Sequence, residues 1–482
     1  MIGNPPYVRA ELLGDFIDYL EEEYEVYHSA SDLFAYFYEK GTKLIKENGL
    51  MGYISNTFDK TTAGKVLRKY LTNYTRLYQY VDFTEVQVFE GATTYPVIIT
   101  LDREDNSDNE FTYIKIPKER RSELIDIESE SEIQVLQSTL DENSWSFLPK
   151  EKAFLLKKLS KYPTIKEKYG KSYRGLITGL NNAFIIQNDW PLSNHVKYLY
   201  EGKEIKKWHT PTPEQKLILF ESGWTKKTYG EDLSEEEALE KVKNDFPAII
   251  KHLLPFEEKA KKRYDQGKFW WELRNCAYYD LFEKPKIIFP NLQNYNKFCL
   301  DERGVYINAP AVFLPSASKT LLCVLNSTIV WEFLLSICVV RSGGYIEVKP
   351  QYFEQIPVPE LKNEDVFEQN ADQIIELTSE LQTVQENLQA LLLSKFDIDK
   401  LSRKLQSWHK FTFKQFLKEL KKKKVTLSLK EEAEWMDYFN EQKTIARELK
   451  TQIAQTDAEI DRMVYELYGL SEEEIGVVEG GV

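Results

Sequence analysis

Apolar residues along the first hundred positions follow two different spacings. In 33–45 and 63–71 they recur every three or four residues, which is typical of an amphipathic helix. Shorter runs of apolar and β-branched residues between these stretches have the length of strands. Helices that alternate with strands indicate an α/β domain, and we expect residues 1–117 to form half of a doubly wound, Rossmann-like sheet. The expected strands are 49–55, 81–83 and 95–101.

The pattern changes further along the chain. Residues 118–145 are charged and only weakly periodic, so we interpret them as a linker. Residues 146–360 are rich in aromatic residues, Gly and Pro, and contain short apolar runs such as 183–186 and 286–290. Short apolar runs separated by many turns favour an α+β domain over this region.

In the last stretch, 361–482, Pro and Gly become scarce while Glu, Gln, Lys and Leu dominate. Two sets of apolar residues lie there at helical spacing, with a gap at Thr456. We predict two long helices that pack on each other as a bundle or an antiparallel coiled coil. The run Lys421–Lys424 is interpreted as a solvated face, with a phosphate contact as the less favoured alternative. The apolar sets are Leu377, Leu381, Val384, Leu388 and Leu391, then Leu449, Ile453, Ile460 and Leu467.

Composition narrows the class of protein. A chain of 482 residues is long enough for two to four domains, and 42% hydrophobic residues with 13% aromatics support a substantial core. The net charge of −14 argues against a generally adhesive nucleic-acid binder but is compatible with a local basic cleft. Without a signal peptide or a long apolar run, we expect a soluble, cytoplasmic protein that does not enter a membrane.

The metal-binding residue types are sparse. The chain has five histidines and four cysteines, and no two cysteines form a CxxC pair. We therefore predict no metal site and interpret the cysteines as buried thiols. They are Cys276, Cys299, Cys323 and Cys338.

The residues Asn4-Pro5-Pro6-Tyr7 suggest a specific chemistry. An Asn side-chain oxygen and the next backbone carbonyl can accept both hydrogens of an exocyclic amine, which localises the amine lone pair for attack. Two prolines stiffen the loop and aim these acceptors, and the aromatic ring can stack on a base taken out of a duplex. An ordinary turn is the alternative for so short a motif.

This tetrapeptide resembles the (Asp/Asn/Ser)-Pro-Pro-(Tyr/Phe) loop of amino-methylating DNA methyltransferases. Three later segments are similar, in the same order, to the γ-type N6-adenine enzymes of that class. They are Asp32–Phe37, Gly49–Phe58 with Ser55 in place of a proline, and Val88–Ile99.

The second region resembles the target-recognition domain of type IIG restriction–modification enzymes, and the tail resembles their usual ending. The longest matching segment is Arg263–Arg274 followed by Pro285–Ile288. With the earlier motifs, the resemblance covers nearly the whole chain. The other matching segments are 173–185, 200–208, 325–327, 343–345, 356–359 and 459–471.

The resemblance implies a site-specific adenine-N6 DNA methyltransferase of a restriction–modification system, with S-adenosylmethionine as methyl donor and double-stranded DNA with a flipped adenine as partner. Asn4 and the Pro5 carbonyl would accept from the adenine amine, Pro6 would brace the loop and Tyr7 would stack on the base. The DNA-binding candidates are Arg174, Thr178, Lys203, Lys206, Lys207, Arg263, Arg274, Lys286 and Tyr345.

Several of these candidates have a structural alternative. Arg274 could pair with Glu272, and Trp270 with Trp271 is interpreted mainly as a core anchor rather than a base stacker. The basic residues near Trp208 would position a phosphate backbone rather than read bases. Gly343-Gly344 is interpreted as a tight turn in preference to a close approach to DNA.

Two parts of the family pattern are missing. No Gly-rich cofactor loop precedes the catalytic loop, and 175–179 and 343–344 lack the strand–turn–helix setting that such a loop needs. The N-terminal nuclease domain of the family is missing too. Asp437 with Glu441-Gln442-Lys443 has the letters of a nuclease acid-x-Lys motif but lies in a predicted helix, so we do not interpret it as a nuclease site. We therefore expect a separate polypeptide to supply the N-terminal half, and the cofactor-binding residues stay unknown. The alternatives are a DNA-recognition subunit without catalysis and an inactive truncated remnant.

Overall fold

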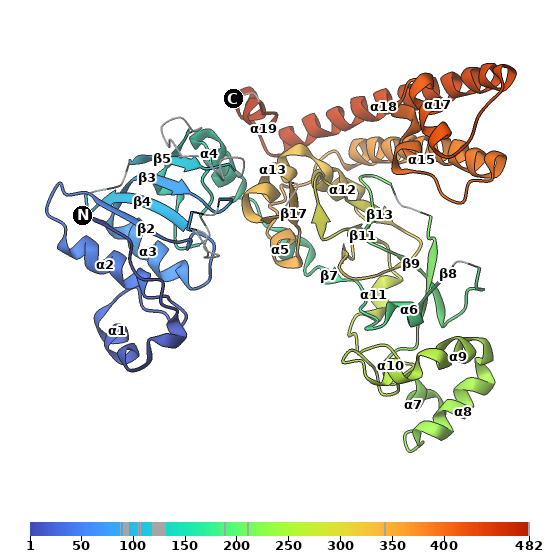
Figure 1. Cartoon of the computed structure of the whole chain (residues 1–482), viewed down its shortest axis with the longest axis horizontal. Coiled ribbons are helices and arrows are strands. Elements are labelled where there is room, and N and C mark those ends of the chain that lie inside the picture. Colours follow the sequence, from blue (N-terminus) through green and yellow to red (C-terminus); the bar gives the residue numbers. More distant parts are fainter. Residues whose placement is uncertain are drawn as a thin grey trace. The chain divides into compact units, whose positions relative to one another are not determined.

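The chain is described by a computed structural model that divides into two compact units, shown in Figure 1. Unit 1 comprises Met1–Lys161 with Gly476–Val482, and unit 2 comprises Tyr162–Ile475. The structure describes residues 1–86, 88–89, 96–104, 106, 108–117, 132–143, 145–187, 189–209, 212–341 and 344–480.

Unit 1 is built on a six-stranded sheet of order β1-β2-β4-β3-β5-β6. The pairs β1–β2 and β3–β5 are parallel, whereas β4 is antiparallel to both of its neighbours and β6 is antiparallel to β5. Four strands therefore run one way and two run the other. The strands are β1 (Ile2–Gly3), β2 (Met51–Asn56), β3 (Arg76–Asp82), β4 (Pro96–Asp102), β5 (Glu110–Lys115) and β6 (Glu132–Leu136).

The two predicted amphipathic helices are confirmed as α2 (Phe34–Leu44) and α3 (Gly64–Tyr74). Along β2, Met51, Tyr53 and Ser55 are buried while the residues between them are partly exposed, which is the period of a half-buried strand. The apolar faces of α2 and α3 pack with these side chains in one core that also contains Ile99. A shorter helix, α1 (Ile17–Glu23), precedes them.

The α/β character predicted for unit 1 agrees with the structure, and a Rossmann-like topology stays a prediction. The sheet is mixed, because β4 inserts antiparallel between β2 and β3. The linker predicted for 118–145 is wrong for those of its residues that the structure describes. Strand β6 pairs with β5, and Trp145 is buried in the core. Residues 118–131 lie outside the described residues. The sequence analysis missed this edge strand because charged residues dominate the stretch and only one face of the strand is covered.

Unit 2 begins with residues 162–360 of the region predicted to be α+β, and its short strands and helices agree with that prediction, whereas residues 146–161 belong to unit 1. The strands form three small sheets of order β14-β9-β10-β8, β13-β11-β15-β7 and β12-β17-β16. The first two sheets share one core with the surrounding helices. The strands are β7 (Tyr173–Arg174), β8 (Ile185–Gln187), β9 (Val196–Tyr200), β10 (Gln215–Ile218), β11 (Lys286–Phe289), β12 (Leu292–Gln293), β13 (Cys299–Asp301), β14 (Tyr306–Ile307), β15 (Val312–Leu314), β16 (Val339–Arg341) and β17 (Tyr345–Glu347).

Helices fill the spaces around these sheets. Ser234 and Thr164 begin α8 and α5 as N-caps, each with a Glu three residues later that completes a capping box. The helices of this part are α5 (Ile165–Tyr169), α6 (Asn181–Phe184), α7 (Trp224–Tyr229), α8 (Glu235–Asp245), α9 (Pro247–Leu253), α10 (Glu257–Lys261), α11 (Tyr279–Phe282), α12 (Lys319–Asn326), α13 (Thr328–Ile337) and α14 (Pro350–Phe353).

The two long C-terminal helices are confirmed as α15 (Glu364–Phe396) and α18 (Leu429–Leu467), which lie side by side in Figure 1. The sequence did not predict that the connection between them forms α16 (Arg403–Gln406) and α17 (Phe413–Lys422) around a separate core. A coiled-coil register for α15 and α18 stays a prediction.

Within the described residues, no single helix has the length and apolar content to cross a membrane; α12 and α13 meet that test only as a pair bent by 62°. The same residues contain no group of three or more His, Cys, Asp or Glu that could hold a metal ion. Cys299, Cys323 and Cys338 are buried thiols, whereas Cys276 is partly exposed.

Candidate functional site

The Asn4–Tyr7 loop follows β1 directly. Strand β1 is parallel to β2, with Ile2 opposite Gly52 and Gly3 opposite Tyr53, so the loop leaves the sheet at the carboxyl edge of β2. A Cβ at position 3 would stand 2.8 Å from Cε1 of Tyr53, so any larger residue there would have to push the Tyr53 ring aside. The loop is thus held at the sheet edge where α/β domains bind their ligands.

The four side chains of the loop differ in exposure. Asn4 and Pro6 are exposed, Pro5 is buried and Tyr7 is partly buried. The Tyr7 ring meets Phe89 edge to face with centroids 6.4 Å apart. Burial raises the pKa of the Tyr7 phenol. Its oxygen is buried and has no hydrogen-bond partner among the described residues. The loop therefore presents an exposed Asn4 side chain and a partly buried Tyr7 ring that contacts Phe89.

The chain after the loop is tied to the start of α2. The Leu33 amide donates to the Val8 carbonyl at 2.9 Å, and the Ala10 amide donates to Asp32 Oδ1 at 3.3 Å. Burial raises the pKa of the Asp32 carboxyl. The Asp-Leu pair that the sequence suggested as a helix start thus makes no side-chain cap on α2 and instead anchors the segment that follows Tyr7.

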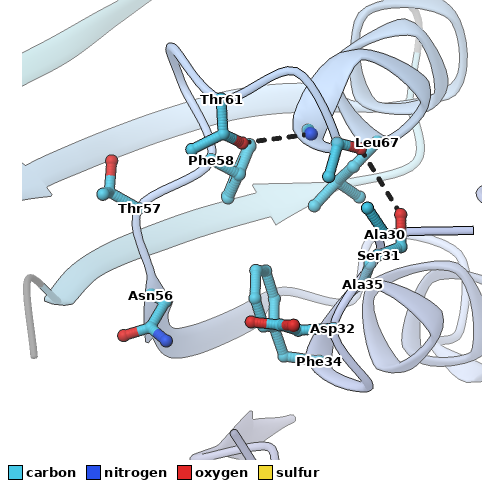
Figure 2. A pocket seen from close by; sticks show the side chains of 12 residues that line it. Ala30, Ser31, Asp32, Phe34, Ala35, Asn56, Thr57, Phe58, Thr61 and Leu67 are labelled. Atoms are coloured by element: carbon cyan, nitrogen blue, oxygen red, sulfur yellow. Dashed lines mark hydrogen bonds between the residues drawn. The ribbon is translucent and has the colours of Figure 1, made fainter. Parts of the chain in front are cut away.

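A cavity of about 370 Å³ lies next to this anchor. Figure 2 shows Asp32 and Phe34 on one side of it and residues of the connection from β2 to α3 on the other. The end of β2 contributes Asn56 and the connection contributes Thr57 and Phe58, whereas none of Asn4 to Tyr7 lines the cavity. The sequence analysis identified 49–58 only as a segment that matches a strand. It did not predict the cavity, because side chains from two separate helices and a loop form it.

Three of the predicted DNA-binding residues are wrong, because they are buried inside unit 2. Thr178 is 1% exposed, Arg263 7% and Lys286 0%. Side chains this deeply buried are not at the surface where a phosphate backbone would lie. The Arg263 guanidinium donates instead to the carbonyls of Thr178, Trp270 and Glu272 at 2.5–3.0 Å, and Lys286 pairs with Asp301.

The buried side chains of the 263–274 segment hold neighbouring backbone segments together. The fully buried Glu272 carboxylate accepts from the backbone amides of Gly223, Thr225 and Lys268 at 2.8–2.9 Å. Trp270 and Trp271 are fully buried, in agreement with their interpretation as core anchors.

Arg274 is 45% exposed and pairs with Asp265 at 2.9 Å rather than with Glu272.

The basic residues after β9 have different surroundings. Lys203 is exposed and pairs with Glu201. Lys206 is exposed and donates to Gln382 Oε1 at 3.2 Å. Lys207 forms an ion pair of 2.6 Å with Asp457 of α18, and the Trp208 indole donates to the same carboxylate at 3.0 Å. Lys207 therefore joins the sheets of unit 2 to the long helix.

A small exposed group surrounds Tyr345 in β17. Lys297 lies over the rings of Tyr295 and Tyr345, at 4.6 and 5.8 Å from their centroids. Both rings are more than a third exposed, and Arg174 is exposed as well. The sequence missed Tyr295 and Lys297, which carry no distinctive spacing. Gly343 lies outside the described residues, and Gly344 adopts φ +74°, which agrees with a turn.

Neighbouring Lys206 and Lys207 give a matched test of the DNA contacts. We expect Lys206→Ala to reduce the steepness of log K against log salt by about one unit, as for loss of one phosphate contact. Lys207→Ala should leave that slope unchanged and lower the thermal midpoint, because Lys207 is already paired with Asp457. Anisotropy titrations at several salt concentrations measure the slope. Equal slopes for both variants would contradict a phosphate contact by Lys206.

Three family models match parts of the chain. Residues 1–89 match the Eco57I restriction-modification methylase, and residues 197–358 match the TaqI-like C-terminal specificity domain. Residues 360–464 match a domain of unknown function, DUF8810. The first match contains the Asn4–Tyr7 loop, and the second contains Lys206, Lys207 and Tyr345.

Curated relatives agree with these matches. The Type II methyltransferase M.BstVI of Geobacillus stearothermophilus is 23% identical over 75% of this chain and 67% of its own length. The Type II restriction enzyme and methyltransferase RM.Eco57I of Escherichia coli is 28% identical over 42% of this chain and 21% of its own length. The chain thus spans between a fifth and two thirds of these relatives.

A solved structure, that of the Type IIL restriction-modification enzyme MmeI in complex with DNA, aligns with 99% of this chain and 56% of that chain. Its TM-score of 0.49 and 14% identity are too low to carry an argument. The family models and curated relatives confirm the resemblance of the chain to restriction–modification methyltransferases that carry a recognition domain.

Proposed function

We propose that this chain is the catalytic-loop and DNA-recognition part of a site-specific adenine-N6 DNA methyltransferase in a restriction–modification system. The single observation that carries the proposal is the Asn4–Tyr7 loop at the carboxyl edge of β2, with an exposed Asn4 beside a partly buried Tyr7. The matches to a methylase and to a specificity domain support it. A cytoplasmic location follows from this role in modifying DNA.

In this proposal the loop prepares the adenine amine for attack. Asn4 Oδ1 and the Pro5 carbonyl accept the two N6 hydrogens, so the nitrogen lone pair is no longer shared with the ring. Tyr7 stacks on the flipped base and holds it against the acceptors. Burial raises the pKa of the Tyr7 phenol, which is uncharged at neutral pH already at its ordinary pKa of about 10. The methylated amine can lose its proton to solvent.

S-adenosylmethionine supplies the methyl group when it is bound. The described residues of this chain do not fit the cofactor by themselves, because none of their strand–turn–helix connections carries a Gly-rich turn. We therefore assign the cofactor to a further polypeptide segment that completes the sheet. Strand β1 supports this assignment, since it is the end strand among the described residues and its Ile2 is 95% exposed.

Isothermal calorimetry with S-adenosylmethionine tests this division of labour. The purified chain is titrated with and without duplex DNA, and then together with a polypeptide that carries the N-terminal half. We expect no cofactor binding to the chain alone and measurable binding to the complemented form, which should also methylate DNA. Binding by the chain alone would show that it holds a cofactor site of its own. Complementation that restores cofactor binding without methylation would favour a recognition subunit.

A further inference from the structure

The connection between α15 and α18, residues 397–428, forms a basic helical tip in an acidic protein. It contains ten Lys and Arg against three Asp and Glu, a net charge of +7. The remainder of the chain therefore carries −21, since the whole chain carries −14. Such a local reversal of sign attracts an anionic partner that the rest of the surface repels.

The fold of the helical tip places this charge on the outside. Trp408 and Phe416 are fully buried in a core that also takes Phe439 from α18. All ten cations are exposed. Lys414, Lys418 and Lys421 are spaced four and three residues apart on α17, so they share the face opposite the buried side chains. The core thus holds a row of cations in a fixed arrangement.

These cations have few acidic partners. Among the described residues, Lys422 is the only one of the ten in an ion pair, with Glu419. At one end of the tip Lys410 lies near Lys450 and His409. Burial, then Lys450 and Lys410, lower the pKa of His409 to about 4. Burial and then Lys410 lower that of Lys450. The mutual repulsion would be relieved by an anion that this part of the chain does not provide.

The long helix fixes how far the helical tip stands from the sheets of unit 2. Asp457 binds Lys207 and Trp208, and Asp461 accepts from the Thr328 amide at 2.8 Å. Eighteen residues of continuous helix separate Asp457 from Phe439, or about 27 Å at 1.5 Å per residue. This distance corresponds to about 8 base pairs of duplex DNA, since ten base pairs span about 34 Å.

We propose that the helical tip binds the phosphate backbone of duplex DNA that flanks the recognised sequence. Lys414, Lys418 and Lys421 supply the principal contacts. This inference rests on the proposed function, because a duplex held by the sheets of unit 2 brings phosphates to the same molecule at high effective concentration. The contacts position the protein and are independent of base sequence.

Salt-dependent DNA binding by the full chain tests the proposal. The variant K414Q/K418Q/K421Q is compared with wild type on a fluorescent duplex long enough for the helical tip and the sheets together. The expected loss of three phosphate contacts reduces the slope of log K against log salt by about 2.7 units. The control K40Q/K46Q/K69Q removes three exposed lysines of unit 1 and should leave the slope unchanged.

The other possible outcomes contradict the helical-tip inference, alone or together with the proposed function. Wild type and helical-tip variant with the same slope would overturn the inference and leave the proposed function intact. An equal loss in the control would show an effect of net charge rather than a contact by the helical tip. Wild-type protein that binds no duplex at all would overturn both proposals. Circular dichroism and the thermal midpoint establish that the variants are folded, which exposed lysines on a packed helix should allow.

Discussion

Replacing Asn4 with Ala is expected to lower the turnover number for methyl transfer by about 100-fold or more, the effect of losing one preorganised hydrogen-bonding group at a reacting centre. Asn4 is exposed and its side chain makes no hydrogen bond within the part of the chain that the structure describes, so its loss should leave the fold intact. Affinity for duplex DNA should therefore stay unchanged. Transfer of labelled methyl groups by the chain complemented with its N-terminal half measures the effect.

Asn4→Asp provides the matched control. Aspartate keeps a side-chain oxygen at the same place, and it occurs at this position of the loop in the resembling methyltransferases, so most of the activity should remain. Full activity of Asn4→Ala would show that the loop does not accept from the target amine, and the proposed mechanism would fall. Inactivity of both variants together with loss of DNA binding would indicate a structural role instead.

Replacing Lys286 with Met is expected to destabilise unit 2 by about 3–5 kcal/mol, the cost of leaving a buried charge without its partner. Lys286 on β11 and Asp301 on β13 face each other in the sheet register, both are 0% exposed, and their charged atoms are 2.6 Å apart. Urea unfolding followed by tryptophan fluorescence measures the change, because Trp270 and Trp271 are buried in unit 2.

Two further variants separate charge from packing. Lys197→Met removes a partly exposed lysine that pairs with Glu283 at 2.8 Å, and should cost about 1 kcal/mol or less. Adding Asp301→Asn to Lys286→Met removes the stranded charge while keeping an acceptor for the Val305 amide, and should recover most of the lost stability. A double variant as unstable as Lys286→Met alone would attribute the loss to side-chain packing.

Helices were predicted better than strands, for a physical reason. The apolar stripes of α2, α3, α15 and α18 repeat over many residues, so their period is visible without knowledge of the partner. The sequence analysis missed strands β5 and β6. For β6 the reason is that it is a short edge strand whose exposed face carries polar residues. Its buried Val135 and Leu136 follow a stretch dominated by charge.

The candidate site was predicted unevenly. The types and order of Asn4, Pro5, Pro6 and Tyr7 carry the expected chemistry in themselves. The choice between a DNA-binding and a structural arginine or lysine depends on burial, which residue type does not reveal. Arg263 and Lys286 have carbonyl and carboxylate partners from distant segments, whereas Arg174 and Lys206 stay exposed.

The sequence by itself determined the Asn-Pro-Pro-Tyr motif, the long C-terminal helices and the resemblance to restriction–modification methyltransferases, because each motif or helical period depends on residues close together in the chain. Only the tertiary structure decided the mixed sheet, the cavity beside Asp32, the burial of three predicted DNA contacts and the basic helical tip. Each of these depends on which distant segments meet. A residue's charge can be read from its type, but its partners and its exposure are set by the fold.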